Sequence, residues 1–156
     1  MWRTLALART MMFMVAAAIL TSVACSDSDP TNPDPHADVR SVLVEVVGGG
    51  TVTFNSSKVA SGQLVLADNS VVAVTFQDDS GGEDAIAQHP DNFELRVNYP
   101  NGNPAGLTFT PSPTNPFAGT FTRTTPTSTP MIVQFELYHI TGEHNDGRWN
   151  VETVVE

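Results

Sequence analysis

The sequence predicts an all-β protein: a single antiparallel β-sandwich of about eight or nine strands, preceded by an N-terminal export signal. Short runs of alternating apolar and polar residues recur along the chain, and clusters of Gly, Pro, Asn, Asp and Ser separate them. Little of the sequence after the first 35 residues has helical periodicity. The chain has 156 residues, of which 40% are hydrophobic and 15% charged. This length and composition suit one folded domain with a short appendage.

The first 24 residues have the pattern of a cleaved signal peptide. Arg3 and Arg9 supply a basic start, and residues 11–20 form an unbroken apolar run. A membrane-spanning helix needs about 20 such residues, whereas a secretory signal uses about 7–15. Small residues then lead to Cys25. We therefore expect residues 1–24 to direct export and to be removed.

Cys25 is the only cysteine, so an internal disulfide is excluded. Its position after the apolar run resembles the lipobox of bacterial lipoproteins, in which the cysteine is lipidated and becomes the mature N-terminus. The family usually has Leu three residues before the cysteine, where this chain has Ser22. An ordinary signal peptidase would also cut between Ala24 and Cys25, and would leave a secreted protein with a free thiol.

The segment after the cysteine reads as a tether. Residues 26–35 contain three Pro, three Asp and no apolar side chain, so they cannot join a core. Proline and like charges favour an extended chain. The predicted organisation is therefore a signal peptide at 1–24, a lipidated cysteine with its Pro/Asp-rich tether at 25–35, and a β-sandwich domain at 36–156.

The strands of the domain are placed by alternation and by the breaks between the runs. Phe93, Leu95 and Val97 face one way while Glu94 and Arg96 face the other, which is the pattern of a sheet buried on one face. The predicted strands are 39–47, 51–55, 62–67, 71–77, 92–99, 107–110, 118–123, 132–140 and 149–155.

This organisation resembles the immunoglobulin-like sandwiches that are common in exported bacterial proteins. About 120 residues with eight or nine strands suit two packed sheets. The resemblance is one of pattern and covers most of the chain after residue 36. The disulfide pair of antibody domains is absent, because the chain has one cysteine.

Charge and motifs narrow the function classes. The net charge of −10 argues against a nucleic-acid partner, which normally meets a basic surface. The sequence has no Gly-x-Ser-x-Gly elbow and no phosphate-binding Gly-rich loop before a helix. We therefore expect the protein not to be an enzyme.

Histidines supply the strongest candidate site. His139 and His144 lie five residues apart across a predicted strand end and loop, and His89 lies on another predicted loop. Imidazole is a common ligand of zinc and copper. A site could form from these three histidines with Glu143 or Asp146 as a carboxylate. A single pair of ligands indicates a zinc site less strongly than two matched pairs would. The alternative is that these histidines are solvated or packed at strand ends.

The acidic run at 78–84 has two interpretations. Its carboxylates could hold calcium, which prefers several oxygen ligands, but their spacing matches no calcium motif. The other interpretation is a solvated loop.

The combined expectation is a non-enzymatic, lipid-anchored protein of the bacterial cell envelope that acts as an interaction or structural module. The lipid would bind the membrane and the domain would contact a protein or polysaccharide. Ser26 replaces the Asp that retains many lipoproteins at the inner membrane, which favours the outer membrane in a double-membraned host. The alternative is a periplasmic or surface domain that binds copper or zinc through His139, His144 and His89; no other cofactor is expected.

Overall fold

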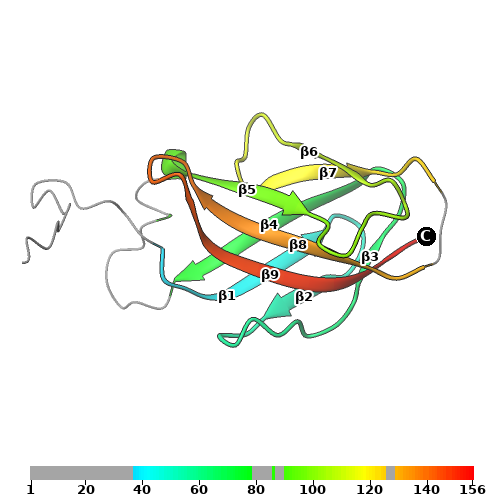
Figure 1. Cartoon of the computed structure of the whole chain (residues 1–156), viewed down its shortest axis with the longest axis horizontal. Coiled ribbons are helices and arrows are strands. Elements are labelled where there is room, and N and C mark those ends of the chain that lie inside the picture. Colours follow the sequence, from blue (N-terminus) through cyan, green and yellow to red (C-terminus); the bar gives the residue numbers. More distant parts are fainter. Residues whose placement is uncertain (1–36, 79–85, 87–89, 126–128) are drawn as a thin grey trace, which may run out of the picture.

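Nine strands form two facing sheets in the part of the chain that the computed structural model describes, residues 37–78, 86, 90–125 and 129–156 (Figure 1). Eight of the predicted strands are confirmed to within two residues at each end, and the ninth begins five residues earlier than predicted. The elements are β1 (Val39–Val46), β2 (Thr51–Phe54), β3 (Leu64–Leu66), β4 (Ser70–Asp78), the 3₁₀ turn η1 (Pro90–Asn92), β5 (Phe93–Asn98), β6 (Thr108–Pro111), β7 (Ala118–Thr122), β8 (Met131–His139) and β9 (His144–Val155).

The strand order is that of an immunoglobulin-like sandwich. One sheet has the order β2-β1-β4-β7-β6 and the other β3-β9-β8-β5. Without β2 and β3, the two sheets follow the A-B-E-D and G-F-C orders of immunoglobulin domains. The described strand pairs are antiparallel except β3 with β9, which run parallel. The predicted fold class is therefore confirmed.

The core lies between the sheets and follows from alternation along the strands. On β8, Val133, Phe135 and Leu137 are fully buried, and β9 places Trp149 directly opposite Phe135. The Trp149 ring meets Phe76 of the other sheet at a centroid distance of 5.4 Å. Large apolar side chains each contribute about 1.5–3 kcal/mol on burial. Aromatic packing between the sheets thus holds a domain that has no internal disulfide.

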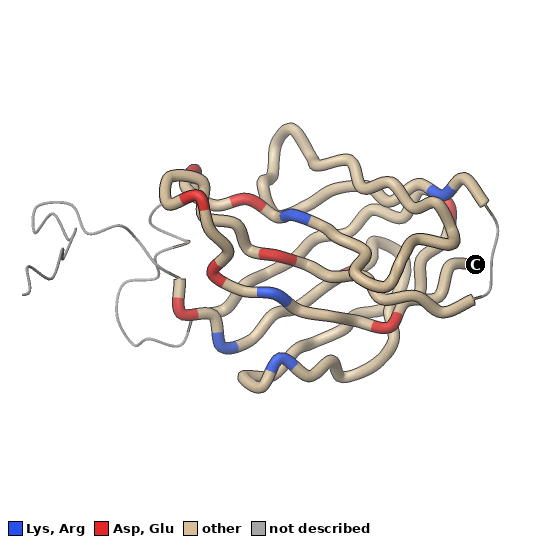
Figure 2. The backbone as a smooth tube through the Cα atoms, in the orientation of Figure 1, with Lys and Arg blue, Asp and Glu red and all other residues tan. Residues whose placement is uncertain are grey.

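Acidic and basic residues lie along β5, β8 and β9 of the four-stranded sheet (Figure 2), and some of them form ion pairs. Arg148 Nε donates to Glu136 Oε1 at 2.7 Å, and Arg96 Nε donates to Glu94 Oε1 at 2.6 Å. The Arg96 guanidinium also covers the Tyr138 ring, with its central carbon 3.1 Å from the ring centroid. The outer face of this sheet is polar, as the alternation in β5 predicts. Arg148 and Arg96 are exposed on it, whereas Glu136 is only 5% exposed beneath its ion pair.

The two ends of the sandwich differ in what they carry. The proximal end holds the first described residue, Ala37, with η1 and the β8–β9 turn at 140–143 (Figure 1). The distal end holds the turns at 47–50 and 67–69 and the C-terminal residue Glu156. Among the described residues, no helix is long and apolar enough to cross a membrane.

Candidate metal centre

The hairpin of β8 and β9 brings two of the predicted ligands together. His139 ends β8 and His144 begins β9, and the two residues form a direct cross-strand pair. Their rings meet edge to face at a centroid distance of 5.0 Å. The prediction that His144 lies on a loop is wrong. Residues 144–147 read His-Asn-Asp-Gly, which is typical of a turn, but pairing with β8 holds them in the strand.

A β-bulge in β9 puts His144 on the same side of the sheet as His139. Leu137 pairs with Gly147 and Tyr138 with Asn145, so Asp146 is an extra residue in β9. Side chains alternate along a strand, and one additional residue reverses which face the following positions occupy. Because of this residue, His144 shares the face of the buried His139 instead of pointing outward.

His139 is fully buried at the proximal end of the core. Its ring stacks on Phe93 of β5, with centroids 4.9 Å apart and planes inclined by 23°. Its Nε2 atom forms a 2.8 Å hydrogen bond with Thr141 Oγ1. Packing against Phe93 and the bond to Thr141 fix the orientation of this imidazole.

His144 is held at both ring nitrogens and lies nearer to solvent. Its Nδ1 donates to the Gly142 carbonyl at 2.8 Å, and its Nε2 lies 2.9 Å from Asp146 Oδ1. The side chain of His144 is 38% exposed. The close fit of the turn explains Gly142: a Cβ there would lie 2.6 Å from His144 Nδ1 and 2.9 Å from His139 Nδ1.

Asp146 completes the cluster with a carboxylate that is only 4% exposed. Its Oδ2 atom accepts a 3.0 Å hydrogen bond from the amide of Ala37, so it also holds the start of the described chain. One candidate ligand atom from each of His139, His144 and Asp146 lies within 4.8 Å of the others. Of the two carboxylates that the sequence suggested, Asp146 belongs to the cluster, whereas Glu143 is exposed in the turn.

Three sequence predictions fall outside the described residues. They concern His89 as a third ligand, the acidic run beyond Asp78, and Cys25 with its tether. The third group that the structure brings to the histidine pair is a carboxylate. Sequence reasoning named this carboxylate as a candidate but could not foresee the bulge that turns it inward.

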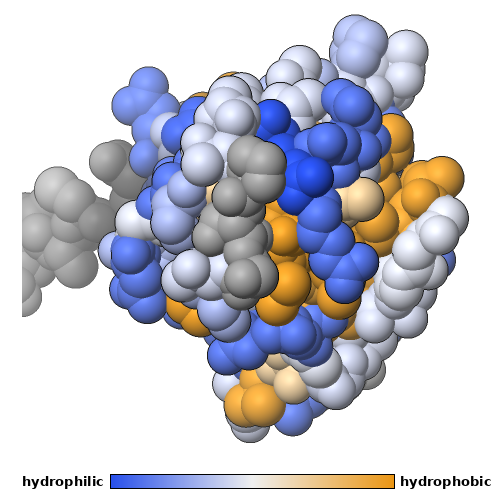
Figure 3. Space-filling view, turned by 90° about the vertical axis from the view of Figure 1, so that its right-hand side faces the viewer, coloured by the Kyte–Doolittle hydropathy of each residue, from blue (hydrophilic) through white to orange (hydrophobic). Residues whose placement is uncertain are grey.

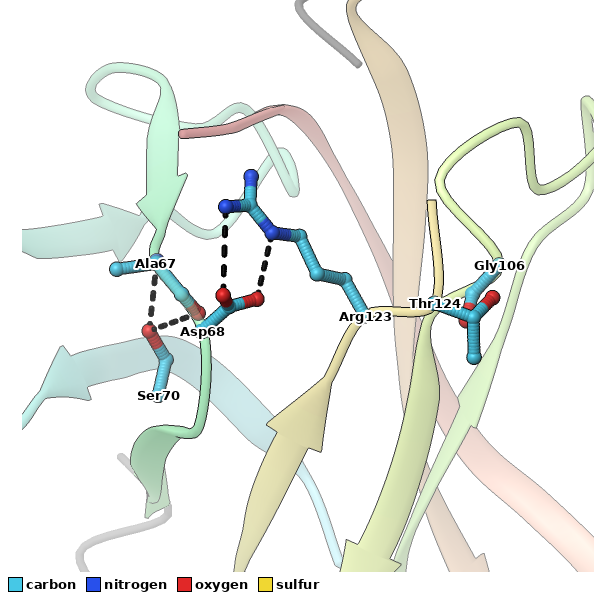
Figure 4. A network of polar contacts seen from close by, with 6 residues as sticks. All are labelled: Ala67, Asp68, Ser70, Gly106, Arg123 and Thr124. Atoms are coloured by element: carbon cyan, nitrogen blue, oxygen red, sulfur yellow. Dashed lines mark hydrogen bonds and ion pairs between the residues drawn. The ribbon is translucent and has the colours of Figure 1, made fainter. Parts of the chain in front are cut away.

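A second polar network, at the distal end, provides a contrast (Figure 4). Arg123 contacts the Asp68 carboxylate with two nitrogens, through Nε at 2.5 Å and Nη2 at 3.4 Å. Ser70 Oγ donates to the carbonyl of Ala67 and accepts from its amide. These bonds close the turn between β3 and β4. The cluster offers one carboxylate and no imidazole.

The proximal cluster can act chemically in two ways. Two imidazoles and a carboxylate form a ligand set that suits zinc or copper(II). The same groups can serve as a hydrogen-bonded latch between the hairpin and the start of the domain. Comparison of the chain with family models, curated proteins and solved structures gives no match.

Proposed function

We propose that this chain is a non-enzymatic, lipid-anchored protein of the bacterial cell envelope, held at the outer membrane, whose sandwich acts as an interaction or structural module. The observation that carries the proposal is the position of Cys25, directly after a short apolar run and directly before a Pro/Asp-rich segment. A lipid on that cysteine would provide the membrane attachment, because the chain's net charge of −10 is repelled by anionic headgroups.

The arrangement of the domain is consistent with such a tether. The described chain starts at the proximal end, where the Ala37 amide is bonded to Asp146. A tether joined there leaves the distal end on the opposite side of the domain (Figure 1). Three exposed valines lie there, with exposures of 69% for Val47, 43% for Val65 and 44% for Val71. Figure 3 shows this end, where apolar and strongly hydrophilic residues lie side by side.

We assign the distal valines as the surface that contacts a protein or polysaccharide partner. Val47 and Val71 are neighbours, since the Val47 amide donates to the Val71 carbonyl at 2.9 Å. Contiguous exposed apolar patches rimmed by polar residues mark interaction sites, and we assign that role to these valines. The interaction face would then point away from the membrane.

Lipid labelling tests the anchor. Cells that express the full chain would be grown with radiolabelled palmitate, beside cells with Cys25→Ala and with the neighbouring control Ser26→Ala. We expect label on the wild type and on the control, and none on the cysteine variant. Equal labelling of Cys25→Ala, or no label on the wild type, would rule out the anchor.

Site-specific photocrosslinking tests the interaction face. A photoreactive residue would replace Val47 at the distal end or Ile140 at the proximal end, two side chains that are both exposed, at 69% and 42%. We expect discrete adducts in intact cells from position 47 and not from position 140. Adducts from position 140 alone would contradict the proposed orientation.

A further inference from the structure

We propose that His139, His144 and Asp146 form a binding site for one zinc or copper(II) ion. This inference is independent of the lipid anchor and rests on the described residues alone. The three side chains come from one hairpin, and one candidate ligand atom of each lies within 4.8 Å of the others. Zinc is bound by imidazole nitrogen and carboxylate oxygen at about 2.0–2.2 Å. His144 Nε2 and Asp146 Oδ1 are already 2.9 Å apart, so binding would require only the more widely spaced ligand atoms to move closer together.

The atoms that would not contact the metal are already held by hydrogen bonds. His139 Nε2 is bonded to Thr141 Oγ1, and His144 Nδ1 donates to the Gly142 carbonyl. Asp146 Oδ2 accepts from the Ala37 amide. Metal-binding histidines typically donate their second ring nitrogen to a carbonyl or other acceptor, and metal-binding carboxylates are hydrogen bonded in turn. The ligand atoms assigned by this pattern are His139 Nδ1, His144 Nε2 and Asp146 Oδ1.

Burial and access also suit a metal. His139 is fully buried and the Asp146 side chain is 4% exposed, so a cation would be held largely out of water. His144 borders a surface hollow of about 480 Å³ that gives an entry path. Two basic side chains line the hollow, and both are engaged elsewhere: Arg148 with Glu136, and Lys58 above the Trp149 ring. Acidic positions outnumber basic ones around this end of the molecule (Figure 2), which favours the approach of a cation.

Three protein ligands leave one tetrahedral position of zinc for water or for a group from a partner. The site would therefore be open on the side of His144. A metal there would join the β8–β9 hairpin to the start of the domain, because Asp146 also holds Ala37.

The test is a metal titration of the full chain, purified in detergent without a histidine tag. Zinc would be titrated against a chromophoric chelator, and copper(II) binding would be followed by electron paramagnetic resonance. Two variants remove one ligand each, His144→Gln and Asp146→Asn. Asp91→Asn in η1 is the matched control, since it removes an exposed acidic residue at the same end.

We expect one ion per chain with sub-micromolar affinity, at least a tenfold loss in His144→Gln and in Asp146→Asn, and no change in Asp91→Asn. The copper spectrum should show coupling to two nitrogens, falling to one in His144→Gln. Zinc binding alone would identify zinc as the ion, and copper binding alone would identify copper. Circular dichroism would establish that each variant is folded. If Asp146→Asn is unfolded, the metal affinity of His144→Gln alone tests the proposal. Wild-type affinity in folded His144→Gln, or no stoichiometric binding by the wild type, would leave the cluster as a latch and overturn the proposal.

Discussion

The two ends of the sandwich both carry a polar cluster, but they hold it in different ways. At the distal end, Asp68 is 59% exposed and its ion pair with Arg123 is open to water. At the proximal end, Asp146 is 4% exposed and His139 is fully buried. A solvent-exposed ion pair contributes little to stability, whereas a buried carboxylate needs its partners. The two clusters therefore differ mainly in burial. The exposed Asp68–Arg123 pair only closes a turn, whereas the buried group of His139, His144 and Asp146 could bind an ion.

Substitution of glycines should show the largest difference in stability between the two ends. A Cβ on Gly147 would overlap the buried Trp149 ring, with Cζ2 and Cζ3 at 2.7 and 2.8 Å and Cη2 closer still. A Cβ on Gly106, at the distal end, would meet the hydroxyl of Thr124, which can rotate away, although the φ of +58° adds strain. We expect Gly147→Ala to lower the free energy of unfolding by about 3 kcal/mol and Gly106→Ala by about 1 kcal/mol. Chemical denaturation measures both values, and equal losses would contradict the account.

The carboxylates should show the next largest difference. Asp146→Ala removes the acceptor of the Ala37 amide and the carboxylate that lies 2.9 Å from His144 Nε2, and we expect a loss of about 2–3 kcal/mol. Asp68→Ala removes an exposed ion pair, so the loss should stay below about 1 kcal/mol. Thermal and urea unfolding without added metal would give the comparison. An equal loss of unfolding free energy in Asp68→Ala and Asp146→Ala would contradict the difference between the two ends.

The sequence predicted the strands much better than it predicted this buried cluster. Alternation in residues such as Phe93, Leu95 and Val97 marks a strand locally, whatever its partner is. The bulge at Asp146 has no local signature, because it arises from the register between β8 and β9. His144 and Gly147 lie in a local sequence that is typical of a turn, and only their pairing with β8 holds them in the strand. Parallel pairing of β3 with β9 is likewise a long-range choice that alternation cannot specify.

A smaller effect is expected at Tyr99, which follows β5 toward the distal end. Among the described residues its buried hydroxyl has no hydrogen-bond partner, and burial raises the pKa of Tyr99 from 10.0 to about 12. The folded protein thus keeps this proton at a pH where the unfolded chain has lost it. The stability that this proton contributes is complete below pH 10 and declines as the pH rises toward 12.

Tyr99→Phe should remove that pH dependence and leave stability at neutral pH unchanged or higher by up to about 1 kcal/mol. The chain has two tyrosines, so Tyr138→Phe is the matched control. Tyrosinate absorbance of Tyr138→Phe, in which Tyr99 is the remaining tyrosine, should titrate near pH 12. Titration of that variant near pH 10 would show that the Tyr99 hydroxyl meets water.

The central claim, that the proximal cluster binds a metal ion, is tested most directly by X-ray absorption at the zinc edge. The full chain would be loaded with one equivalent of zinc and compared with His144→Gln. The account predicts two imidazoles and one or two oxygen ligands around zinc in the wild type, at about 2.0–2.2 Å, and one imidazole in the variant. A zinc spectrum without imidazole scattering, or one that His144→Gln leaves unchanged, would show that the proximal cluster is a structural latch.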